Sequence, residues 1–138
     1  MTPAPGTVVD SSVLLDVFTE DARWLDWSQS QLIEAAQRGP LILNAVILAE
    51  VAPRFSLIED LRSALPSMAH SEEIPIAASF LAGHAHAAYR RAGGAREAVL
   101  PDFLIGAHAA VTDRPLLTRD PRRVATYLPG ASLISPYD

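Results

Sequence analysis

The chain has 138 residues, of which 49% are hydrophobic, and its formal net charge is −5. It contains no cysteine, which excludes a disulfide scaffold, a thiol nucleophile and a cysteine-ligated zinc site. All eleven basic residues are arginines, so a Walker phosphate loop and Schiff-base chemistry, which both need lysine, are excluded as well. The length fits one domain over residues 1–138, and no signal peptide or long apolar run is visible, which predicts a cytoplasmic protein without membrane spans.

The first half of the chain alternates short apolar runs with longer amphipathic stretches. Residues 7–9 and 41–43 are predicted strands, because each is a short run rich in apolar or β-branched residues. Helices are predicted over residues 11–18, 21–38, 45–54 and 56–65. Asn44 is a suitable N-cap for the third of these. Trp24 and Trp27 lie on one face of the helix over 21–38, where they pack in the core or contact a partner.

The second half continues the same alternation. Helices are predicted over residues 74–92, 101–112 and 121–127, and strands over 115–118 and 131–134. Short apolar strands that alternate with helices predict an α/β fold, in which a central parallel sheet is covered by helices on both faces. Sites in such folds form at the carboxyl ends of the strands.

Three acidic residues stand at strand ends or helix starts. Asp10 and Asp120 follow predicted strands directly, and Asp102 lies at the start of the helix over 101–112. Each also has a structural interpretation: Asp10 and Asp120 as helix N-caps, and Asp102 as a complement to the helix dipole. On the face of Asp102, Gly106 and Ala109 are small enough to let another element or a substrate approach the carboxylate.

Glu50 is the most informative acid, because the helix around it is apolar on almost every side. Such a helix is predicted to be buried, and a buried carboxylate needs a partner. Arg54, four residues further on, is the structural partner. We favour the functional alternative, in which Glu50 belongs to a site.

Taken together, the four acids Asp10, Glu50, Asp102 and Asp120 are expected to converge at one edge of the sheet. Clustered carboxylates repel each other and cannot all ionise without a cation. Mg²⁺ or Mn²⁺ prefers such oxygen ligands. An ion there would bind a phosphate oxygen and activate water, so the set predicts phosphodiester hydrolysis.

Five segments in order carry a family resemblance: residues 8–15, 43–51, 74–94, 101–109 and 116–120. They resemble PIN-domain ribonucleases, most closely the VapC-type toxins of bacterial toxin–antitoxin pairs. The resemblance implies a three-layer α/β/α PIN fold and Mg²⁺ or Mn²⁺ held by the four acids. It implies Ser12, Asn44 and Thr118 as supporting residues, and cleavage of RNA that leaves a 5′-phosphate and a 3′-hydroxyl. It also implies a homodimer and an antitoxin that covers the active site.

Arginines beside Asp120 are predicted to contact RNA phosphates: Arg119, Arg122 and Arg123. The net charge of −5 argues against nucleic acid as a partner, although bound cations would offset part of it. His108 stands where the family more often has a small residue, and it is interpreted as a packing residue. The alternatives are a PIN nuclease of RNA processing, a non-catalytic binding module in which the acids are caps, and a phospho-receiver-like domain, which the missing lysine disfavours.

Overall fold

The computed structural model describes residues 5–95 and 99–137. Five strands form one fully parallel sheet in the order β3-β2-β1-β4-β5. The strands are β1 (Thr7–Val9), β2 (Leu41–Leu43), β3 (Ala69–Ser71), β4 (Leu116–Leu117) and β5 (Leu133–Ile134). Every residue of β1, β2 and β4 is buried, as expected for a sheet that is covered on both faces.

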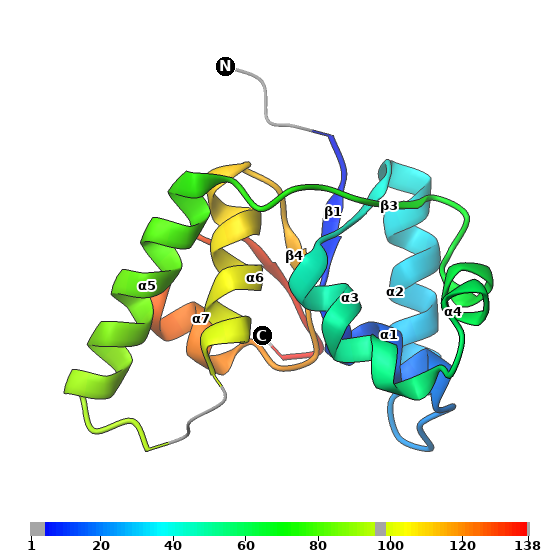
Figure 1. Cartoon of the computed structure of the whole chain (residues 1–138), viewed down its shortest axis with the longest axis horizontal. Helices are drawn as coiled ribbons and strands as arrows, with labels where there is room; N and C mark the ends of the chain where they lie inside the picture. Colours follow the sequence, from blue (N-terminus) through cyan, green and yellow to red (C-terminus); the bar gives the residue numbers. More distant parts are fainter. Residues whose placement is uncertain (1–4, 96–98, 138) are drawn as a thin grey trace.

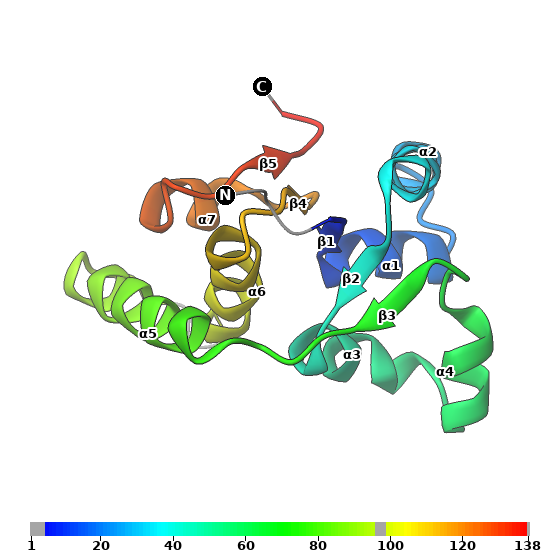
Figure 2. The same cartoon turned by 90° about the horizontal axis from the view of Figure 1, so that it is seen from above.

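Helices cover both faces of this sheet, which confirms the predicted three-layer α/β/α architecture. Figure 2 shows α1 and α2 on one side of the sheet and α5 and α6 on the other. In Figure 1, α5 and α6 run side by side. The helices are α1 (Ser11–Phe18), α2 (Leu25–Arg38), α3 (Ala45–Val51) continued by a 3₁₀ turn (Ala52–Arg54), α4 (Ile58–Ala64), α5 (Ile76–Arg91), α6 (Leu100–Val111) and α7 (Arg122–Tyr127). Within the described ranges, no helix has the length and apolarity to cross a bilayer.

The strand order positions the site. From β1 the chain builds the sheet outward through β2 and β3, and it later adds β4 and β5 on the other side of β1. The direction of winding therefore changes between β1 and β4, and ligands of parallel α/β sheets bind beside the carboxyl ends of the strands at such a point. Asp10 and Thr118 follow these two strands, and the Asp10 amide donates to the Leu117 carbonyl over 2.9 Å.

A small residue lets α7 pack tightly against α6. A side chain at Gly106 would place its Cβ 2.9 Å from Val124 and 3.0 Å from Leu128, so only glycine permits this approach. The close packing carries the residues around Asp120 toward the start of α6, where Asp102 lies. The expectation that small residues on this face of α6 admit a neighbouring element is confirmed for Gly106.

Three predicted features were wrong in detail. Helix α2 begins at Leu25 instead of Asp21, because the Asp21 carboxylate accepts the Arg23 and Trp24 amides and closes a turn there. Strand β3 was not predicted, since Ala69–Ser71 is a half-exposed edge strand without an apolar pattern. Helix α3 is not buried all round: Ile47 and Val51 face the core, whereas Ala45 and Ala49 are exposed.

Candidate active site

Asp10 is fixed by two hydroxyl groups. The side chains of Ser12 and Thr118 both donate to its Oδ2, over 2.7 and 2.8 Å. Each hydroxyl oxygen in turn accepts a backbone amide, from Arg119 at Ser12 and from Asp120 at Thr118. These amides orient the hydroxyl groups so that their only protons point to Asp10. The structure thus places two of the three predicted supporting residues, Ser12 and Thr118, directly on the first acid.

Glu50 reaches the same region from α3. It is half-buried, and Ser11 donates to its Oε1 over 2.8 Å. Arg54, its predicted structural partner, is exposed, and no ion pair joins the two in the described part of the chain. Ser11 was missed from the sequence, because its partner lies 39 residues further along the chain.

Asp102 and Asp120 complete the set from the other side. Asp10, Asp102, Thr118 and Asp120 line one small cavity. Asp102 lies in the first turn of α6, and the Arg123 guanidinium donates to its Oδ2 from Nη2 over 2.7 Å and from Nε over 3.3 Å. Asp120 keeps 65% of its side chain exposed, with an Arg119 nitrogen 3.7 Å away.

Neither Asp10 nor Asp120 uses its side chain as a helix cap. Asp10 is the N-cap residue of α1, but its carboxylate makes no capping hydrogen bond. Asp120 precedes Pro121, the N-cap residue of α7, and α7 also has no side-chain cap. The capping interpretation of these two acids is therefore wrong, and neither carboxylate is needed to start a helix.

Burial and mutual repulsion act on the acids. Burial raises the pKa of Asp10, which the Ser12 and Thr118 hydroxyls partly oppose, and the charges of Asp102 and Asp120 raise it further. Burial likewise raises the pKa of Glu50, Ser11 opposes this, and the nearby Asp10 and Asp102 charges add to the rise. Each of the four acids thus interacts electrostatically with at least one other, so they form one cluster.

The chemistry of this cluster fits a hard divalent cation. All four groups are carboxylates, and both hydroxyl donors of Asp10 use Oδ2, which leaves Oδ1 with no protein donor in the described part of the chain. Within residues 5–95 and 99–137, no three acidic or histidine side chains already lie close enough to enclose an ion. Asp102 is paired with Arg123, whose Nη2 lies 2.7 Å from its Oδ2.

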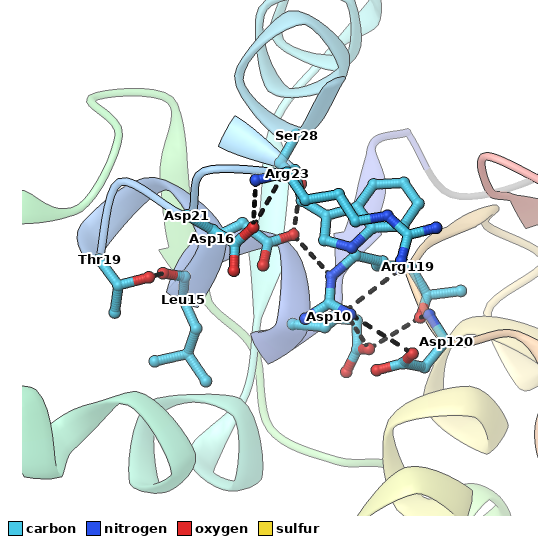
Figure 3. A network of polar contacts seen from close by, with 12 residues as sticks. Asp10, Leu15, Asp16, Thr19, Asp21, Arg23, Ser28, Arg119 and Asp120 are labelled. Atoms are coloured by element: carbon cyan, nitrogen blue, oxygen red, sulfur yellow. Dashed lines mark hydrogen bonds and ion pairs between the residues drawn. The ribbon is translucent and has the colours of Figure 1, made fainter. Parts of the chain in front are cut away.

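Arg119 belongs to a polar network beside the cluster. Figure 3 shows it between Asp16 and Asp120. Its Nε donates to Asp16 Oδ2 over 2.8 Å, and Ser28 donates to the same oxygen. Burial tends to lower the pKa of the Arg119 guanidinium, but the hydrogen bond and charge of Asp16 outweigh this and raise it. Asp16 was missed, although an acid within the apolar run Val13–Phe18 is the signal that singled out Glu50.

The third predicted supporting residue lies elsewhere. Asn44 is fully buried; its Oδ1 accepts the Ile47 amide as the N-cap of α3, and its Nδ2 lies 2.9 Å from His108 Nδ1. Because the Asn44 amide group donates to Nδ1, the other ring nitrogen carries the proton and donates to Glu72 Oε1 over 2.8 Å. Among the described residues, Asn44 makes no hydrogen bond to any of the four acids, and its side chain caps the helix that carries Glu50.

The three arginines predicted to contact RNA differ in their surroundings. Arg119 and Arg123 are paired with acids, whereas Arg122 is exposed and makes no ion pair in the part of the chain that the structure describes. All three line one open groove, which begins beside the cluster at Asp120.

Comparisons with known proteins identify the family and agree with the fold. A family model of the PIN domain matches residues 7–127. No curated protein sequence matches the chain. Solved structures of toxin–antitoxin complexes share the fold: VapBC2 from Rickettsia felis, bound to a DNA fragment from its promoter, has a TM-score of 0.70 at 16% identity, covering 94% of this chain and 97% of that one.

Two further structures show the same likeness. VapBC-1 from nontypeable Haemophilus influenzae has a TM-score of 0.68 at 14% identity, covering 94% of this chain and 96% of that one. VapC20 from Mycobacterium tuberculosis, a toxin that cleaves the sarcin–ricin loop, has a TM-score of 0.61 at 15% identity, covering 88% and 95%. Since the family match spans most of the chain and includes all four clustered acids, the chain belongs to the PIN domain family.

Proposed function

We propose that this chain is a Mg²⁺- or Mn²⁺-dependent endoribonuclease that acts in the cytoplasm as the toxin of a VapC-type toxin–antitoxin pair. The observation that carries the proposal is the cavity lined by Asp10, Asp102 and Asp120, with Glu50 electrostatically coupled to it. Membership of the PIN family supports a nuclease, and the toxin–antitoxin structures of the same fold support a toxin.

Each group would have a definite part in the reaction. Asp10, Glu50, Asp102 and Asp120 would hold the cation. When bound, such an ion would lower the pKa of the water that acts as the nucleophile and would stabilise the negative charge of the phosphate. Ser12 and Thr118 keep Asp10 oriented, and Ser11 does the same for Glu50.

The arginines and the products complete the proposal. Within residues 5–95 and 99–137, no hydrogen bond or ion pair engages the Arg122 guanidinium, so this group can bind a phosphate, while Arg119 and Arg123 offer only the groups that do not bind Asp16 or Asp102. Hydrolysis would leave a 5′-phosphate and a 3′-hydroxyl.

Two protein partners belong to the proposal, a second copy of the chain and an antitoxin. Exposed apolar side chains support them. On α5, Ile76 is 89% and Phe80 is 70% exposed, one helical turn apart. Other exposed apolar side chains are Ile33 of α2, Ile58 of α4 and Leu57, which directly precedes α4. Apolar surface of this kind marks protein contacts.

The test is cleavage of a mixed RNA pool by the antitoxin-free protein, with and without Mg²⁺ or Mn²⁺. Wild type is compared with Asp10→Asn and with the matched control Asp60→Asn, a change at an exposed acid of α4. We expect metal-dependent cutting by wild type and Asp60→Asn and none by Asp10→Asn. If the folded wild type binds no divalent ion and cuts nothing, the acids are structural and the chain is a binding module.

A further inference from the structure

An open groove of about 890 Å³ runs along α7 and the C-terminal segment. Its lining includes Arg119, Asp120, Arg122, Arg123, Thr126 and Tyr137. Asp120 also lines the small cavity of the acid cluster. A polymer that lies in the groove therefore passes directly beside the acids.

The groove has an aromatic wall. Tyr137 is 54% exposed, and its ring meets Trp24 edge to face, with the ring centroids 6.1 Å apart. Two hydrogen bonds hold the segment: the Tyr137 amide donates to Ser135 Oγ, and this hydroxyl donates to the Tyr137 carbonyl. Trp24 is itself half-buried beneath the Arg119 guanidinium, which lies 5.6 Å from its ring. The Tyr137 ring thus contacts Trp24, and its exposed part lines the groove.

The charges of the groove attract phosphates only weakly, and stacking on the aromatic ring can add to the binding of RNA. Two of its three arginines are already paired with acids, the chain carries a net charge of −5, and Arg122 alone of the three has no ion pair among the described residues. Attraction to phosphates is accordingly weaker than in a typical basic groove. Stacking of a base on an aromatic ring contributes about 1–3 kcal/mol and needs no net charge.

Only an unpaired strand can use such a ring. Bases in an A-form duplex are stacked on each other, and their faces are not accessible to side chains. Proteins that hold single-stranded nucleic acid place exposed aromatic rings beside cationic side chains, as Tyr137 lies beside Arg122 in this groove.

We propose that Tyr137 is a base-stacking platform, with one base of an RNA strand on its ring and the neighbouring phosphate beside Arg122. This inference rests on the proposed function, to which it adds a binding residue outside the acid cluster. Tyr137 is a binding residue here, since it contacts the base and not the reacting atoms.

The test measures binding apart from cleavage. In an Asp10→Asn background, the Kd of a fluorescein-labelled single-stranded RNA octamer of mixed sequence is measured by anisotropy for Tyr137, Tyr137→Phe and Tyr137→Leu. We expect Tyr137→Phe to bind within about twofold of its parent and Tyr137→Leu to bind about tenfold more weakly, the loss of one stacked base. The salt dependence stays the same in all three, because no phosphate contact is removed.

Two controls complete the design. A fully paired RNA duplex that contains the octamer sequence is expected to bind more weakly than the octamer and to be indifferent to Tyr137→Leu. Circular dichroism melts of each variant check that it is folded, and 4-thiouridine crosslinking to the peptide that contains Tyr137 gives a second readout. The inference is overturned if Tyr137→Leu binds the octamer as its parent does, or if the duplex binds equally well.

The outcome is separable from that of the proposed function. If wild type cuts RNA but Tyr137→Leu binds and cuts with unchanged Kd and KM, the stacking platform is wrong and the nuclease stands. If no RNA is cut with any divalent ion while the octamer still binds in a Tyr137-dependent way, the nuclease is wrong and the platform stands.

Discussion

The Asp10 carboxylate is subject to opposing influences. Two hydroxyl groups stabilise its charge, whereas burial and two neighbouring acids oppose it, and the net effect raises its pKa. A cluster of like charges destabilises the folded protein unless a cation is bound, and functional sites often reduce stability in this way. The same residues that would bind the ion are therefore expected to limit the stability of the metal-free protein.

Asp10→Asn should raise the Tm of the metal-free protein at pH 7. A raised folded-state pKa means that this group favours folding below its ordinary value of 3.8 and that the benefit is lost as pH rises through the folded-state pKa. Asparagine stays neutral and can still accept the Ser12 and Thr118 hydroxyls, so we expect a gain of roughly 3–6 °C. Melts in EDTA from pH 4 to pH 8 should show the gain growing with pH. An equal or lower Tm at pH 7 would contradict this account.

Arg123 stands where a cation would otherwise neutralise Asp102. Its guanidinium binds Oδ2, so it competes for that carboxylate and adds positive charge beside the cluster. We expect Arg123→Met to increase Mn²⁺ affinity about tenfold, as the removal of a nearby unit charge implies. Mn²⁺ binding is measured by electron paramagnetic resonance, with Arg122→Met as the matched control, because Arg122 has no ion pair in the described residues. A weaker affinity for Arg123→Met would show instead that Arg123 orients Asp102 for the metal.

The four acids were predicted from the sequence, as were the hydroxyl partners of Asp10 from the family resemblance, whereas the other polar partners were not. Asp10 and Asp120 follow apolar strands and Glu50 interrupts an apolar helix, and each of these is a local pattern. The partners are distant: Ser11 meets Glu50 across 39 residues, and Arg119 meets Asp16 across 103. Such pairs depend on how the elements pack, which no local pattern contains.

Whole elements show the same distinction. Strands β1 and β2 have the predicted bounds, because all of their residues are buried and the sequence shows each strand as a short, mainly apolar run. Strand β3 is held in the sheet by backbone hydrogen bonds to β2. The Leu41 amide donates to the Met68 carbonyl, and the Glu72 amide donates to the Leu43 carbonyl. Its side chains are exposed or half-exposed, so its sequence carries no strand pattern. An edge strand of this kind is defined by its neighbour and not by its own residues.

Four elements are joined by one buried polar chain. It runs from Asn44 at the start of α3 through His108 of α6 to Glu72 after β3, and from there to Arg114 before β4. Arg114 also donates to the Pro5 carbonyl. His108, interpreted as a packing residue from the sequence, is fully buried but is held by hydrogen bonds on both ring nitrogens. This series of hydrogen bonds fixes α3, and with it Glu50, relative to α6, which carries Asp102.

Glu72→Gln tests this link. The Arg114 hydrogen bond, which burial partly opposes, and the His108 hydrogen bond lower the pKa of Glu72 from 4.5 to about 2. A lowered pKa stabilises the fold above the unfolded-state value of 4.5, and this contribution is lost as pH falls toward 2. Because the Glu72 side chain is 30% exposed, we expect a loss of only roughly 1–2 kcal/mol at pH 7.

Urea unfolding at pH 7 and pH 3 measures the effect, and the difference between Glu72→Gln and wild type should shrink at the lower pH. Glu73→Gln, at the exposed neighbouring residue, is the matched control and should leave stability unchanged. A difference that is equally large at both pH values would mean that the charge of Glu72 is not the source of its contribution.

Exposed apolar side chains on α5 form a stripe on the surface of the molecule. Ile76 and Phe80 are four residues apart and lie on the same helix face. His84, four residues further, lies against Phe80 with ring centroids 4.5 Å apart and ring planes tilted by 45°, and it extends the stripe. A self-complementary stripe of this kind suits a twofold contact, in which the same patch serves both copies.

Ile76→Asp combined with Phe80→Asp is expected to convert a homodimer into a monomer, because each copy would then place carboxylates in an apolar contact without partners. Light scattering after size-exclusion chromatography at several protein concentrations measures the mass, which should approach 14.8 kDa for the variant and twice that for wild type. The matched control, Ile33→Asp with Ile58→Asp, changes the other exposed apolar surface and should leave the dimer intact. If the control dissociates and the α5 variant does not, the contact between copies lies on α2 and α4, and α5 is left for the antitoxin.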